Sequence, residues 1–176
     1  MRCWRLDDGR QTLVLGSDRD HLAEIIYWGP RLPDAEDLTT LFSAHAIDVT
    51  GGMLDANPEL SICPEATRSF PGQPGLILRA EDGTPLLPKF CFENAEEGDD
   101  QLELRFVDAA NGLTYIAHFS IDPATHMIVA QATLEAAAPV HLHWLSAPVF
   151  PGPQLSDDMI DVAGRWCGEF QLNRTP

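Results

Sequence analysis

Short runs of β-type sequence, separated by turn signals, recur through most of this 176-residue chain. In residues 102–107, apolar and charged side chains alternate with the period of two expected of a half-buried strand. Asp82-Gly83 and Asn111-Gly112 are hairpin signals, because such pairs tolerate the positive φ of tight turns. Strands at intervals of roughly ten residues predict an all-β antiparallel sandwich. The other predicted strands are residues 11–15, 22–28, 76–79, 113–121, 127–134, 140–146 and, with a bend at a glycine, 162–172.

One segment departs from this pattern. Apolar residues at helical spacing predict a short surface helix over residues 34–45. Asp34 is its predicted N-cap, and Glu36 and Asp37 suit the positive end of the helix dipole. His45 is expected at the solvated edge of the apolar stripe. Two stretches rich in proline and glycine, residues 50–75 and 148–158, are predicted to be long loops.

The chain is strongly acidic, with 11 Lys and Arg against 27 Asp and Glu and a formal net charge of −16. This field repels phosphate backbones and anionic lipid head groups, so neither nucleic acid nor a membrane surface is expected as a partner. No apolar stretch approaches the ~20 residues that a membrane-spanning helix needs. Because Met1 is followed by no apolar signal segment, a cytoplasmic protein is expected. The length fits one sandwich domain over residues 1–176.

The cysteines and histidines predict no metal site. No cysteine belongs to a CxxC pair, and no histidine stands at zinc-finger spacing from one. Apolar neighbours instead predict buried free thiols in a reducing compartment. His141 and His143 would share one face of a strand, but two ligands are too few for a structural metal. No cofactor is expected. The four cysteines are Cys3, Cys63, Cys91 and Cys167.

No complete catalytic constellation is present, so no catalytic residue is assigned. The chain has no GxSxG nucleophile elbow, phosphate-binding glycine loop, HExxH or EF-hand motif. Most of its acids fall in runs typical of solvated faces, at residues 18–20, 96–100 and 157–158. Its tryptophans are expected to pack in the core or an interface more often than to bind sugar. They are Trp4, Trp28, Trp144 and Trp166.

Four stretches, taken in order and with their spacing, resemble one family. Residues 26–32 (IYWGPRL) are similar to an early YWG strand of this family, which is followed by a basic residue. Residues 60–76 are similar to a strand and loop in which an acidic residue precedes a turn that contains glycine and an aromatic residue. Residues 108–113 sit where a D-x-x-x-G-L hairpin is expected, and residues 164–174 resemble a G-x-W-x-x-E segment. The family is that of the N-terminal domains of glycoside hydrolase family 36 α-galactosidases.

The resemblance implies an antiparallel β-supersandwich of the galactose mutarotase-like type that precedes a (β/α)8 catalytic barrel in the same polypeptide. The barrel would supply two aspartates for retaining hydrolysis of terminal α-D-galactosides, so this chain alone is expected to be inactive. The parent enzyme is expected to be a homo-oligomer. Residues 51–57 are the stretch expected to reach the rim of the sugar pocket, through the side chains of Met53, Asp55 and Asn57. The residues expected between the two domains are Arg165, Trp166, Glu169 and Arg174.

Two other hypotheses come from different classes. The chain could be a free-standing carbohydrate-binding sandwich that belongs to no enzyme. It could also be a small sugar epimerase of the mutarotase type, in which histidine and glutamate share the acid–base work. The candidate pairs are then His118 or His143 with Glu103 or Glu135.

Overall fold

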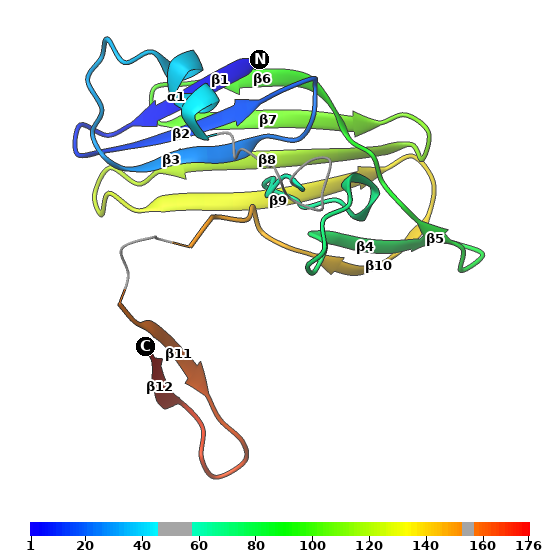
Figure 1. Ribbon diagram of the computed structural model, residues 1–176. Coiled ribbons are helices and arrows are strands. Elements are labelled where there is room, and N and C mark those ends of the chain that lie inside the picture. Colours follow the sequence, from blue (N-terminus) through cyan, green and yellow to red (C-terminus); the bar gives the residue numbers. More distant parts are fainter. Residues whose placement is uncertain (46–57, 153–156) are drawn as a thin grey trace, which may run out of the picture.

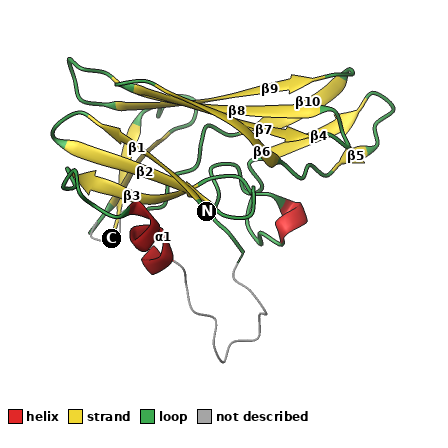
Figure 2. Ribbon diagram, turned by 90° about the horizontal axis from the view of Figure 1, so that it is seen from above, coloured by secondary structure: helices red, strands yellow, loops and turns green. Residues whose placement is uncertain are grey.

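The computed structural model describes residues 1–45, 58–152 and 157–176. Two antiparallel sheets form its main layers (Figures 1 and 2). The first has the order β1-β2-β3 and the second the order β6-β7-β8-β9. A smaller sheet, β10-β4-β5, lies at one end, and the β11–β12 hairpin projects from the body. The strands are β1 (Arg2–Asp7), β2 (Gln11–Ser17), β3 (Glu24–Pro30), β4 (Leu76–Ala80), β5 (Pro85–Leu86), β6 (Cys91–Glu97), β7 (Gln101–Asp108), β8 (Leu113–Ile121), β9 (Ile128–Ala136), β10 (Val140–Leu145), β11 (Met159–Ala163) and β12 (Gln171–Thr175).

The core lies between the two main sheets. Every second residue of β7 and β8 is buried, which confirms the period of two in the sequence. Aromatic rings pack against one another along this layer. The centroids of Phe106 and Tyr115 are 6.5 Å apart. Those of Phe92 and Phe106 are 5.8 Å apart, with an angle of 75° between the ring planes. Trp4 packs on Phe92 at 5.3 Å and belongs to the core, as predicted. The all-β antiparallel sandwich is therefore confirmed.

The other three tryptophans are not in the core, so for them only the interface part of the expectation stays a prediction. Trp28 lies on β3, at the edge of its sheet, and is half-exposed although it contacts Phe150. Trp144 lies beside a register shift in β10 and is also half-exposed. Trp166 lies in the loop of the projecting hairpin. A strand-like sequence around a tryptophan does not determine whether its side chain is buried. Burial depends on which faces of the sheet are covered by other layers.

The helix α1 (Leu38–His45) is shorter than predicted and begins at a different cap. The Asp37 carboxylate accepts hydrogen bonds from the backbone N–H groups of Thr39 (3.0 Å) and Thr40 (3.2 Å), as an N-cap does. Asp34, the predicted cap, instead pairs with Arg31 at 2.6 Å. The helix covers the outer face of the β1–β3 sheet (Figure 2), which explains why β2 is buried on both faces.

Several further expectations are corrected. Residues 162–172 are not one bent strand but parts of β11 and β12 with a turn between them. β1, β5 and β6 had not been predicted. The four cysteines are free, but Cys91 and Cys167 are exposed, because one begins an edge strand and the other lies in the hairpin loop. Cys63 is buried as predicted, and its burial raises the pKa of the thiol to about 12.

No helix among the described residues is both long and apolar enough to cross a bilayer. Nor do they contain a group of three or more His, Cys, Asp or Glu side chains arranged to hold a metal ion.

Candidate functional site

The predicted site residues fall in two places. The three expected at the sugar pocket, Met53, Asp55 and Asn57, lie outside the described residues, so their role stays a prediction. The four expected between domains lie on the β11–β12 hairpin or in its loop. The structure therefore brings Arg165, Trp166, Glu169 and Arg174 together on one projecting element (Figure 1).

In the turn of the β11–β12 hairpin, the backbone at Gly164 lies very close to the backbone at Glu169. A Cβ at Gly164 would stand 2.6 Å from the Cα of Glu169, so only glycine fits where the two arms converge. Cys167 and Phe170 adopt positive φ values of 64° and 58°, which residues other than glycine seldom do. The Cys167 N–H donates to the Glu169 carboxylate at 3.3 Å. Glu169 thus contributes to the turn itself, a role that the sequence did not indicate.

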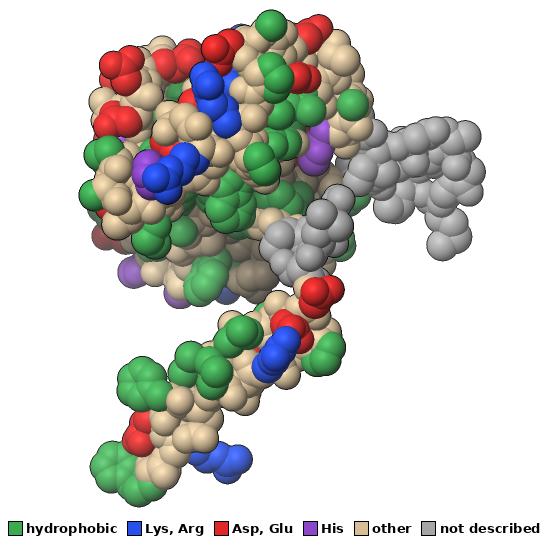
Figure 3. Space-filling view, turned by 90° about the vertical axis from the view of Figure 1, so that its left-hand side faces the viewer, with side chains coloured by type: hydrophobic (Ala, Val, Ile, Leu, Met, Phe, Trp, Pro, Cys, Tyr) green, Lys and Arg blue, Asp and Glu red, His purple; other side chains and the backbone are tan. Residues whose placement is uncertain are grey.

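Next to its loop, one face of the hairpin is apolar and has no covering layer among the described residues. Val162 lies opposite Leu172 in the register, and Ile160, two residues before Val162, points to the same side, where it lies opposite Arg174. Asp161 and Asn173 occupy the other face and share a hydrogen bond of 3.2 Å. Figure 3 shows hydrophobic side chains along the hairpin and at its far end. A two-stranded ribbon alone is marginally stable in water, so such a face suits contact with another protein surface.

The aromatic side chains in the loop of the hairpin are more exposed than the apolar side chains of its strands. The exposed fraction is 90% for Trp166 and 87% for Phe170, although aromatic side chains of this size normally bury most of their surface. Phe170, Ile160, Val162 and Leu172 had not been singled out as interface candidates. The alternation of apolar residues along 160–162 and at 170–172 could have identified them, had the segment been recognised as a hairpin. Arg174, by contrast, already has an ion-pair partner in Asp158.

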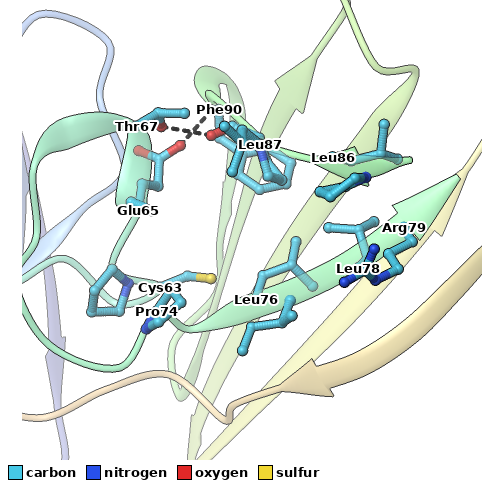
Figure 4. Close-up of a pocket in the computed structure, with 15 residues that line it drawn as sticks. Cys63, Glu65, Thr67, Pro74, Leu76, Leu78, Arg79, Leu86, Leu87 and Phe90 are labelled. Atoms are coloured by element: carbon cyan, nitrogen blue, oxygen red, sulfur yellow. Dashed lines mark hydrogen bonds between the residues drawn. The ribbon is translucent and has the colours of Figure 1, made fainter. Parts of the chain in front are cut away.

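A second candidate site is an apolar pocket of about 270 Å³ beside β4 and β5 (Figure 4). Three segments form its walls, residues 63–67, residues 74–79 and residues 85–90. Leu76 and Leu78 come from β4, and Leu86 and Leu87 from the chain around β5. Its volume is slightly below the ~300–1,000 Å³ usual for ligand sites. Because its lining is mostly apolar, an apolar group matches it better than a sugar with many hydroxyl groups.

A buried carboxylate stands at one end of this pocket. Glu65 accepts hydrogen bonds from the Phe90 N–H and from Arg68 Nε, both at 2.7 Å. Burial raises the pKa of the Glu65 carboxyl, while the Phe90 N–H and then Arg68 act in the opposite direction. Arg68 also donates to the Phe90 carbonyl at 3.1 Å and lies 2.8 Å from His21 Nε2. Because both oxygens of Glu65 are engaged, this network holds the loop of residues 61–70 to Phe90, the residue just before β6, and does not form an acid–base pair.

The acid–base candidates of the epimerase hypothesis lie on two sheets: His118, Glu103 and Glu135 on the outer face of the β6–β9 sheet, and His143 on β10. His118 stands opposite Glu103, and its Nδ1 is 3.9 Å from the carboxylate, beyond hydrogen-bond distance. Glu135 instead binds Arg105 at 2.8 Å. His143 occupies the register shift of β10 and is exposed. None of these contacts forms the histidine–glutamate pair that the hypothesis requires.

Comparison with known proteins decides the family. The model of the glycosyl hydrolase family 36 N-terminal domain matches residues 21–176. The chain belongs to this family. This match confirms the predicted resemblance to the family 36 N-terminal domains. None of the curated proteins matches the chain.

Solved structures agree on the fold. The GH36 α-galactosidase AgaA of Geobacillus stearothermophilus has a TM-score of 0.76 at 17% identity over 99% of this chain. AgaB of the same organism gives 0.74 at 16% identity, and the α-galactosidase of Lactobacillus brevis 0.73 at 18%, each over 99% of this chain. The chain spans only 27–28% of the length of these enzymes. The fold that the chain shares with these enzymes thus extends over 99% of its length.

Proposed function

We propose that this chain is the non-catalytic N-terminal β-sandwich domain of an α-galactosidase, and that a (β/α)8 catalytic barrel follows it in the same polypeptide. The observation that carries the proposal is the family match over residues 21–176, combined with a span of 27–28% of the similar α-galactosidases. The substrate of the parent enzyme would be a terminal α-D-galactoside, hydrolysed with retention of configuration. Its nucleophile and its acid/base would both lie in the barrel.

The hairpin is the proposed contact with the barrel. Its exposed apolar face and the two aromatic side chains of its loop support this role, since a face of this kind gains free energy when another surface covers it. Trp166 and Arg165 remain interface candidates, and Phe170 joins them. Glu169 and Arg174 contribute to the hairpin through their own contacts.

Three further parts of the proposal concern the parent enzyme. Met53, Asp55 and Asn57 would stand at the rim of the sugar pocket, where Asp55 accepts a hydrogen bond from a sugar hydroxyl and Met53 covers an apolar sugar face. The parent would be a homo-oligomer in the cytoplasm. Its sandwich would support packing and assembly and take no part in bond cleavage.

Activity measurements test the proposal. The full gene product is expected to hydrolyse a chromogenic α-galactoside, and the 176-residue chain alone to show no hydrolysis above background. The open reading frame is expected to continue past Pro176 into alternating β and α segments, with aspartates at strand ends. Hydrolysis by the 176 residues alone, or a frame that stops at Pro176, would contradict the proposal. Sugar binding without any downstream barrel would favour the free-standing binding module.

The contact between hairpin and barrel has its own test. Replacing both Trp166 and Phe170 by alanine is expected to destabilise the full-length enzyme by about 3–6 kcal/mol, because burying each large apolar side chain contributes ~1.5–3 kcal/mol. Urea denaturation followed by tryptophan fluorescence and circular dichroism measures the change.

The same double substitution in the 176-residue chain provides the matched control. There both side chains are almost fully exposed, so the free energy of unfolding is expected to change by less than ~0.5 kcal/mol per site. Equal effects in the two proteins would show that the aromatic side chains do not contact the barrel.

A further inference from the structure

One side of the sandwich is less well covered than the rest of the described structure. A sheet of three strands faces a sheet of four, and β3 and β9 are the edge strands on the same side (Figure 1). Every inward-facing residue of β8 is buried. The inward-facing residues of β9 pack on the same core but are only partly buried. They are Ile128, Ala130, Ala132 and Leu134. The core is therefore incompletely covered between β3 and β9.

Trp28 stands on this side, near the end of β3. It lies opposite Leu13, a core residue of β2, so its side chain is on the inner face of the sheet. Its ring meets Phe150 edge-on with the centroids 5.4 Å apart, and Phe150 is 6.3 Å from Phe119 of β8. Even so, Trp28 is 52% exposed, and Met127, just before β9, is 64% exposed. Trp28, Phe150 and Met127 together are called the Trp28 patch.

Hydrogen bonds join the two main sheets beside the Trp28 patch. The Trp28 indole N–H donates to Gln11 Oε1 at 3.0 Å, and the Gln11 amide donates to the His126 carbonyl. His126 Nδ1 lies 3.0 Å from the Asp8 carboxylate. Asp8 also accepts from the backbone N–H groups of Arg10, at 2.8 Å, and Gln11, at 2.9 Å. These polar groups satisfy one another, so what the patch offers to a partner is its apolar surface.

This chemistry favours one kind of partner. A sugar needs polar groups that are placed to bind its hydroxyls, but the polar groups beside Trp28 are already bonded to one another. A second copy of the chain would bring another net charge of −16, and the two copies would repel each other. An apolar protein surface within the same polypeptide meets neither obstacle, and it gains free energy by covering Trp28 and Met127.

We propose that the Trp28 patch is a contact surface for the catalytic barrel of the parent enzyme, in addition to the β11–β12 hairpin. This inference rests on the proposed function, since the chain spans only 27–28% of the length of similar α-galactosidases. The end of β3 and the start of β9 lie at the end of the sandwich from which the chain leaves toward the hairpin (Figure 1). Figure 3 shows hydrophobic side chains on this face of the body, above the hairpin.

The size of a stable interface also requires more than the hairpin. Such an interface engages ~20–30 residues on each side. Residues 159–175, which form the hairpin, are fewer than this, and only one of their faces is apolar. A barrel that contacts the hairpin must therefore also contact the body of the sandwich, and the Trp28 patch is the apolar surface at that end.

Hydroxyl-radical footprinting with mass spectrometry tests the proposal, because the oxidation rate of a side chain follows its exposure to solvent. Trp28 and Met127 are expected to be oxidised at least about fivefold more slowly in the full gene product than in the 176-residue chain, since half-exposed side chains would become buried in an interface. Trp144 is the matched control. It is 47% exposed on β10, toward the opposite end of the sandwich, and its rate is expected to be the same in both proteins.

Met127→Asp provides a second test. In the full gene product it is expected to return the oxidation rate of Trp28 to that of the 176-residue chain, because burying a carboxylate without a partner is costly. Leu142→Asp introduces the same charge at an exposed position of β10 and is expected to leave Trp28 protected. Circular dichroism verifies that each variant is folded.

Hydrolysis of a chromogenic α-galactoside by the same preparation separates this inference from the proposed function. An active gene product in which Trp28 and Met127 are oxidised as fast as in the 176-residue chain would overturn the contact alone. Protection of Trp28 in the 176-residue chain by added galactose would overturn it too, because a sugar would then occupy the patch. So would protection that is lost when the full gene product is diluted, since the partner would then be a second copy.

Discussion

Replacing Arg68 by alanine is expected to lower the free energy of unfolding by about 3–5 kcal/mol, because it removes one partner of a buried ion pair. The Glu65 side chain is only 3% exposed and would be left buried without the cation beside it. The loop of residues 61–70 would also lose the bonds from Arg68 to the Phe90 carbonyl and to His21. Urea denaturation at pH 7 measures the loss.

The double variant Glu65→Gln/Arg68→Met separates charge from packing. It removes both charges and keeps most of the side-chain volume, so it is expected to recover at least half of the stability lost in Arg68→Ala. The single variant should also depend on pH. Because burial raises the pKa of Glu65, its neutral form is favoured in acid, and the deficit of Arg68→Ala should shrink as the pH falls toward 4. A loss below ~1 kcal/mol at pH 7, unchanged in acid, would mean that the pair contributes little.

Phe106→Ala is expected to cost about 3–5 kcal/mol, as other large-to-small changes of buried aromatic residues do. Phe106 is fully buried between the two main sheets and packs against Phe92 and Tyr115. Val107→Ala, one residue along β7, is the matched control, because Val107 points to the outer face and is only half-buried. Its expected cost is below ~1 kcal/mol. Similar losses for both variants by urea denaturation would place the core elsewhere.

The strands that could be predicted are those whose burial alternates. β8 was predicted with its observed bounds, because its two faces differ clearly from each other in polarity. β6 could not be found in this way. It is an edge strand in which acidic residues occupy much of the length, so its composition is that of a solvated loop and only pairing with β7 makes it a strand.

The candidate site was predictable only in part. The resemblance of residues 164–174 to a family segment located the hairpin, but not its geometry. The turn depends on positive φ values at Cys167 and Phe170, which are not glycines and carry no turn signal. The exposed apolar face depends on the register of β11 with β12, since Val162 and Leu172 become neighbours only through that pairing. The network of Glu65, Arg68 and His21 joins residues that are up to 47 positions apart.

The order of the four-stranded sheet leaves β6 and β9 as its two edges, and these edges differ in charge. β6 carries Glu93, Glu96 and Glu97. Residues 128–134 of β9 read IVAQATL, seven positions with no charge, proline or glycine. A strand from another molecule would meet three carboxylates at the first edge and none along these seven residues of the second. If isolated copies of the domain associate strand to strand, we therefore expect them to pair at β9 and not at β6.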